Sequence, residues 1–88
     1  FALEDALGAG ALVDALVARE PALELHDGAR AAALLYRAVA SRLAEAVASA
    51  DHAHALAELG FAGDIERCAT LDVIDTVPIL RDGLFVAA

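Results

Sequence analysis

The sequence predicts a mostly helical segment that ends in a β-hairpin. Three observations favour this fold class. Apolar residues recur at intervals of three and four along most of the chain, which is the spacing of one helix face. Alanine, the best helix former, is abundant in the same stretches. Near the end, Asp82-Gly83 stands between two short apolar runs, which is the signal of a two-residue hairpin turn.

The composition predicts that the chain cannot bury all of its apolar surface by itself. Its 88 residues suffice for one small domain and are 60% hydrophobic, with a mean hydropathy of +0.62. No charge-free apolar run is long enough for a membrane span, so we expect none. The excess instead predicts a missing partner surface, which is either the rest of a longer chain or another subunit of a homo-oligomer. A first residue other than Met agrees with a longer chain.

The negative net charge argues against nucleic acid as a partner and favours a metal cation wherever the chain binds an anionic substrate. The net charge is -8 and all six basic residues are arginines, so the basic surface of a nucleic-acid-binding protein is absent. An anionic substrate would be repelled unless a divalent cation intervenes, which is an argument for a metal. The single cysteine excludes an internal disulfide and a cysteine-based zinc site, and we expect a cytoplasmic protein.

The first helix is expected from Leu3 to Arg19. Glu4 and Asp5 lie in its first turn, where negative charge meets the positive end of the helix dipole. Gly8 and Gly10 each weaken a helix by about 1 kcal/mol relative to Ala. Such a cost indicates close approach of another backbone or of a ligand. By residue pattern alone, the two acids are either charges of a helix start or part of a site.

The second helix is expected to be long. After a short connector, Asp27 is predicted to cap a helix that reaches Ser49. Arg37 lies on its polar face, where it is either a solvated charge or a contact for an anion. The buried stripe is expected to contain Leu35, Val39, Leu43, Ala46 and Val47.

The third helix is expected from Asp51 to Gly60. Gly60 fits the left-handed position after a helix end, with Phe61 packing back on the helix. His52 and His54 point to different sides of this helix and make a poor metal pair. We assign no catalytic role to any histidine.

The last elements are a short helix and the hairpin. The helix is expected from Ile65 to about Leu71, with Asp64 as its N-cap or first-turn acid. Cys68 on this helix is expected to be a buried small hydrophobe. Val77–Arg81 and Leu84–Val86 are the two expected strands, and the proline in the first favours an edge position.

Two stretches carry a resemblance to a known family. The first is Phe1–Ala11, where a helix opens with Glu-Asp and continues into Ala-Gly-Ala. The second is Glu58–Val73, read ELGFAGDIERCATLDV, which runs on into Thr76–Gly83. Together, in order and spacing, they resemble the 2-phosphosulfolactate phosphatase family, the ComB-like proteins; Ala18–Ala57 matches only as a helical region. Members are longer, so residues 1–88 resemble the C-terminal part of a single α/β domain, a three-layer fold with a mixed sheet.

The resemblance implies an enzyme and names its residues. ComB-like enzymes depend on Mg²⁺ and hydrolyse 2-phosphosulfolactate to sulfolactate and phosphate in coenzyme M biosynthesis. By resemblance, Glu4 and Asp5 serve the magnesium, and Asp64 is a third acid of the same site. Neighbouring helix residues diverge by about 100°, so we expect one of Glu4 and Asp5 to face the magnesium or its waters and the other to hold the helix start. The phosphate-binding motifs are expected upstream, in the N-terminal remainder of the protein.

The residue pattern also allows an alternative without catalysis. The chain could be a helical protein-interaction module without catalytic activity, whose excess apolar surface docks on a partner. Such a module would fold alone, whereas the enzyme part would aggregate alone. Circular dichroism and dye binding on residues 1–88 would distinguish the two.

Overall fold

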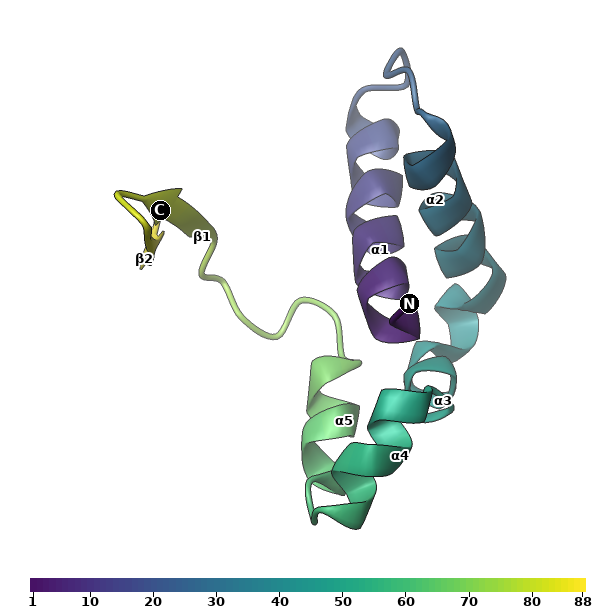
Figure 1. Cartoon of the computed structure of the whole chain (residues 1–88). Helices are drawn as coiled ribbons and strands as arrows, with labels where there is room; N and C mark the ends of the chain where they lie inside the picture. The colour runs from purple at the N-terminus through teal and green to yellow at the C-terminus, as the bar shows by residue number, and fades with distance from the viewer.

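The computed structural model describes all 88 residues and is mostly helical with a terminal hairpin, as predicted. Its elements are α1 (Leu3–Arg19), α2 (Asp27–Val39), a 3₁₀ turn (Ala40–Arg42), α3 (Leu43–Ala48), α4 (Asp51–Glu58), α5 (Ala62–Cys68), β1 (Pro78–Arg81) and β2 (Leu84–Ala87). Figure 1 shows α1 and α2 as an antiparallel pair, α3 and α4 following at the N-terminal end of α1, and the hairpin standing apart. The mixed sheet implied by the family resemblance is not among these elements and stays a prediction. None of the helices combines the length and apolar composition that a bilayer crossing requires.

The pairing of α1 with α2 rests on a close backbone approach at Gly10. A Cβ placed on Gly10 would lie 2.7 Å from the Cβ of Tyr36 and closer still to the carbonyl oxygen of Ala32. The approach predicted from the glycine is therefore confirmed at this position. At Gly8 an added Cβ would meet nothing within 4 Å, so no backbone of this chain approaches it.

An ion pair also joins the two helices. The Nε of Arg37 in α2 donates a hydrogen bond to Oδ1 of Asp14 in α1. Both side chains are partly exposed, and exposed pairs contribute only about 0–1 kcal/mol to stability. Of the two roles left open for Arg37, solvated charge or anion contact, neither describes it fully, because its guanidinium is engaged by a carboxylate of its own chain.

The long helix expected from Asp27 to Ser49 is interrupted, which corrects that prediction. The backbone leaves the helical region at Val39 (φ -123°, ψ 3°) and again at Arg42 (φ -141°, ψ 42°). Val39 is β-branched, and the following Ser41 can compete for backbone hydrogen bonds, so this stretch favours a helix poorly. The break redirects the chain, and α3 then contacts α1, α2, α4 and α5.

The start of α2 also differs from the prediction. His26 is the N-cap residue, with extended backbone and no capping bond from its side chain. Asp27 is already helical, so its carboxylate acts through its charge at the positive helix end rather than as a cap. Oδ1 of Asp27 lies 3.7 Å from Nη1 of Arg30 one turn later.

The end of α4 follows the prediction at Gly60. Gly60 has a φ of +91°, in the left-handed region. Its N–H donates to the carbonyl of Ala57, and the N–H of Phe61 donates to that of Leu56, each at 3.0 Å. This pair of bonds is the Schellman motif, which satisfies the last carbonyls of a helix. The turn returns the chain so that α5 packs against α4 and α3.

Helix α5 begins earlier and ends earlier than expected. It covers Ala62–Cys68 instead of starting at Ile65, and Asp64 lies in its first turn, one of the two predicted positions. Cys68 is exposed, so the expectation of a buried thiol was wrong. The reason is that α5 packs only on α3 and α4, which leaves its remaining face uncovered.

The predicted hairpin is confirmed. Strands β1 and β2 pair in antiparallel register, with Arg81 opposite Leu84 next to the turn. Asp82 and Gly83 have φ values of 51° and 79°, both positive, as a type I′ turn requires. Neither strand contacts a helix, and Figure 1 shows the hairpin at the end of an extended segment after α5.

The core is small and built mainly from alanine. The predicted stripe of the second helical region is only half-buried along its length. Large apolar side chains stay exposed on helices and strands, among them Leu12 at 69%, Leu16 at 56% and Phe85 at 78%. The chain therefore carries the open apolar surface that its composition predicts. The buried residues are Leu7, Gly10, Ala33, Ala50, Ala53 and Ala69.

We expect Gly10→Ala to destabilise the protein by roughly 1–3 kcal/mol, the usual cost of overpacking. The backbone carbonyl of Ala32 leaves no room for the new methyl group, and α2 would have to shift. Gly8→Ala is the matched control on the same helix and should gain up to about 1 kcal/mol, because Ala is the better helix former. Urea unfolding of both variants measures the difference. A Gly10→Ala variant as stable as Gly8→Ala would contradict the close approach.

Candidate functional site

Three acidic side chains from opposite ends of the helical region line one hollow. Glu4 and Asp5 lie in the first turn of α1, and Asp64 lies in the first turn of α5. The hollow has a volume of about 390 Å³, and His52 and Cys68 also line it. The three acids that the sequence singled out thus line the same hollow. Apolar groups complete the lining: Ala2, Val47, Ala53, Leu56 and Ile65.

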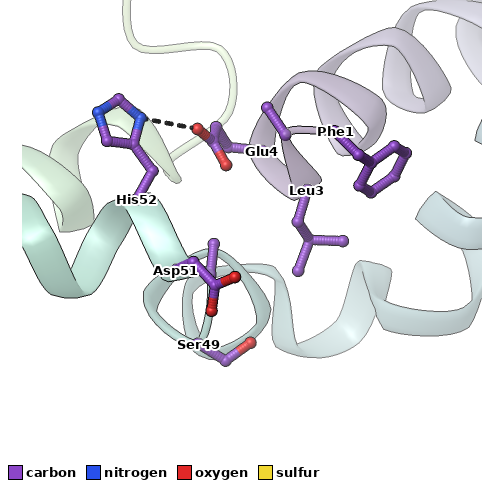
Figure 2. A pocket seen from close by; sticks show the side chains of 8 residues that line it. Phe1, Leu3, Glu4, Ser49, Asp51 and His52 are labelled. Atoms are coloured by element: carbon purple, nitrogen blue, oxygen red, sulfur yellow. Dashed lines mark hydrogen bonds and ion pairs between the residues drawn. The ribbon is translucent and has the colours of Figure 1, made fainter.

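A second hollow lies on another side of the α1 start. Its volume is about 440 Å³, and Figure 2 shows its lining side chains, among them Phe1 before α1, Leu3 at the start of α1 and Asp51 at the start of α4. Glu4 and His52 line this hollow as well as the first one. The two side chains therefore stand where the hollows border each other.

Glu4 and His52 form the one side-chain hydrogen bond between the start of α1 and α4. The Nδ1 of His52 donates a hydrogen bond to Oε1 of Glu4, with 3.0 Å between the two atoms (Figure 2). The hydrogen bond from its own backbone N–H, and then the bond from His52, lower the pKa of Glu4 below its ordinary value of 4.5. Glu4 is therefore an ionised carboxylate at neutral pH.

The backbone of His52 is fixed by its neighbours although its ring is exposed. Ala50 and Ala53 on either side are buried, at 4% and 6% exposure. The His52 side chain is 67% exposed, while that of Glu4 is 29% exposed. The small alanines anchor the first turn of α4, and the ring projects from this anchored turn toward α1 (Figure 2).

Asp5 and Asp64 are free of such partners. Both are exposed, and neither takes part in a side-chain hydrogen bond or an ion pair within the chain. The α1 helix has no side-chain cap, since its N-cap residue is Ala2. The expected division, with one acid facing a metal and the other holding the helix start, stays a prediction, and both acids lie in the first turn of α1. One of the two, Glu4, is engaged by a side-chain partner, and the other, Asp5, is not.

The donor set suits a hard cation that completes its shell from elsewhere. Carboxylate oxygens are the ligands that Mg²⁺ prefers, and its sites need only one or two carboxylates besides waters and substrate oxygens. The chain contains no group of three or more His, Cys, Asp and Glu side chains that could hold a metal ion alone. Glu4 and Asp5 therefore fit a magnesium site of this open kind and not a closed cage of protein ligands.

The residue that sequence reasoning did not place at the site is His52. Its distance in sequence from Glu4, 48 positions, leaves no local signal that the two side chains meet. The spacing argument against a His52–His54 metal pair concerns one helix alone, and the two rings do border different hollows. The contact follows from the break after α2, which carries α3 and α4 back to the start of α1.

Comparison with known proteins connects these residues to one family. The family model for 2-phosphosulpholactate phosphatase matches residues 1–83. A probable 2-phosphosulfolactate phosphatase of Thermotoga petrophila is 42% identical over 86 residues, which cover 98% of this chain and 36% of that protein. A protein of the same name from Carboxydothermus hydrogenoformans is 38% identical over 78 residues, which cover 89% of this chain and 32% of that protein. Another, from Caldanaerobacter subterraneus, is 33% identical over 84 residues, which cover 96% of this chain and 34% of that protein. The chain thus spans about a third of the length of these curated relatives. No solved structure matches it.

We expect His52→Ala to raise the pKa of Glu4, because the variant loses one of the two hydrogen bonds that lower it. The lowered pKa means that the ionised Glu4 stabilises the fold above pH 4.5, and that this contribution is lost as the pH falls through the lowered value. In the variant the loss therefore begins at a higher pH.

The carboxyl carbon signal of Glu4, followed by NMR as a function of pH, measures this shift directly. His54→Ala removes a neighbouring ring of the same helix and should leave the Glu4 titration unchanged. Identical Glu4 titrations in the wild type and His52→Ala would contradict the contact.

Proposed function

Because this chain belongs to the 2-phosphosulfolactate phosphatase family, we propose that it is part of a magnesium-dependent phosphatase. The proposed substrate is 2-phosphosulfolactate or a similar small phosphorylated sulfonate or carboxylate, and the products are sulfolactate and phosphate. We further propose that the enzyme acts in coenzyme M biosynthesis and in the cytoplasm. The residues of the relatives that this chain does not span would supply the rest of the site.

The observation that carries this proposal is the convergence of three acids on one hollow. Glu4 and Asp5 come from the stretch that opens the chain, and Asp64 comes from the stretch after Gly60; both stretches resemble the family. Glu4 and Asp5 are neighbours on α1, and an interaction module would not require Asp64 of α5 to line the same hollow. This shared lining, together with the family match, favours the enzyme over the module.

Each acid receives a role that its surroundings allow. Magnesium, when bound, would neutralise the phosphoryl oxygens of the substrate. Glu4 and Asp5 would hold the ion or its waters at the positive end of α1, and Asp64 would act from α5 across the hollow. Glu4 is ionised and hydrogen-bonded, which fits a ligand of fixed direction, whereas Asp5 is unengaged and free to turn toward the ion.

The phosphoryl group needs further cations from outside this segment. No arginine lines either hollow, and Arg37 is engaged by Asp14. The sequence also lacks a glycine-rich loop of the Walker type. We therefore assign the phosphate-binding groups to the residues of the relatives that this chain does not span.

The open apolar faces support the same placement. Leu12 and Leu16 on α1, and Phe85 on β2, are large apolar groups that stay mostly exposed in this chain. In a protein of the family's length, the remaining sheet would cover such faces, because a domain buries its helices against another layer. A homo-oligomer is the second candidate for this cover.

The test uses the full-length phosphatase that carries this segment. We expect phosphate release from 2-phosphosulfolactate in the presence of Mg²⁺ and its loss in EDTA. Glu4→Ala and Asp5→Ala should each lower kcat/KM by at least about 10-fold, since even outer-shell partners of a metal cost 10–100-fold when removed. Glu20→Ala, which removes an exposed acid after α1, is the matched control and should retain full activity.

Three results would each refute one part of the proposal. Full turnover in EDTA would exclude the magnesium. Absence of phosphate release under all conditions would exclude the substrate class. Unchanged magnesium dependence and turnover in both Glu4→Ala and Asp5→Ala would exclude the site.

A further inference from the structure

We propose that His52 is a positioning residue, which holds the Glu4 carboxylate in the direction needed to bind the magnesium ion; this inference rests on the proposed function. No role for a histidine follows from the sequence, and the acids alone do not explain why a ring from α4 reaches the start of α1. We base the positioning role of His52 on its hydrogen bond to Glu4.

The geometry makes His52 the sole side chain that orients Glu4. The bond from Nδ1 to Oε1 is 3.0 Å long and is the one side-chain hydrogen bond that Glu4 makes. A glutamate has three rotatable side-chain bonds and, in a first helical turn, could project in several directions. The hydrogen bond to Oε1 restricts the rotation of this carboxylate, and Glu4 and His52 both line the two hollows.

The histidine can serve as a fixed reference because its own helix is anchored. Ala50 and Ala53 are buried next to it, so the first turn of α4 cannot move without disturbing the small core. The neighbouring acids lack an equivalent: Asp5 and Asp64 have no side-chain partner. Only one of the three carboxylates is thus oriented before any ligand arrives.

A purely structural role explains the contact less well. The His52 ring is 67% exposed, and exposed ion pairs and hydrogen bonds of this kind add little to stability. A metal ligand, in contrast, gains affinity from an outer partner that fixes its orientation, and loss of such a partner typically weakens metal binding 10–100-fold. The position of the bond, at the edge of the acidic hollow, matches this second role.

The test compares three substitutions in the full-length phosphatase. His52→Ala removes the ring, whereas His52→Asn places an amide N–H where Nδ1 stood and so keeps the donor to Glu4. His54→Ala is the matched control on the same helix, because its ring borders a different hollow. The readouts are Mn²⁺ binding without substrate, followed by electron paramagnetic resonance, and the magnesium dependence of phosphate release.

We expect His52→Ala to weaken Mn²⁺ binding by about 10-fold or more and to raise the Mg²⁺ concentration needed for half-maximal activity by a similar factor. His52→Asn should restore most of both, and His54→Ala should match the wild type. The melting temperature should change little in all three, which separates positioning of a ligand from support of the fold.

Two outcomes would overturn the inference. If His52→Ala binds Mn²⁺ as tightly as the wild type, His52 does not position a metal ligand. If His52→Asn is as impaired as His52→Ala, the ring acts through Nε2 and not through its bond to Glu4. A wild type that binds Mn²⁺ but releases no phosphate would contradict the proposed function alone, and the binding comparison would still decide the role of His52.

Discussion

The close approach of α1 and α2 at Gly10 is the constraint from which the rest of the arrangement follows. A single position without a side chain lets the carbonyl of Ala32 lie against the backbone of α1. The two helices then run side by side, and the break after Val39 can turn the chain back to where α1 began. Because the helix pair places the end of α2 near the start of α1, Glu4 can hydrogen-bond to His52 of α4 and line one hollow with Asp64 of α5.

Local chemistry determines much of this fold, and those parts could be predicted from the sequence. Three of these parts depend on a few neighbouring residues each. They are the extent of α1, the left-handed conformation of Gly60 after α4, and the positive φ values of Asp82 and Gly83 in the hairpin turn. Helix propensity, capping and turn preferences act within such short windows. The long-helix prediction failed at the break between α2 and α3, where Val39 and Ser41 weaken a helix and the chain then packs α3 on α1 and α5, distant contacts that no local window contains.

The candidate site also has features that the sequence predicts and features that only the folded chain shows. Glu4, Asp5 and Asp64 were singled out by their place in two family-like stretches, and first-turn positions for them follow from helix starts. That they line one hollow required the folded chain, and so did the approach of His52. The exposed Cys68 shows the reverse error: its apolar character suggested burial, but whether a helix face is covered depends on elements outside that helix.

The two outer edges of the hairpin differ in the number of backbone amide donors that they expose. The bond from the N–H of Ala88 to the carbonyl of Val77 fixes which residues point their amides inward, so the amides of Leu80, Phe85 and Ala87 face away from the partner strand. Pro78 has no amide hydrogen at the corresponding place on β1. The outer edge of β2 therefore offers two amide donors at alternate residues, whereas that of β1 offers one, so a further strand would find more hydrogen-bond donors along β2.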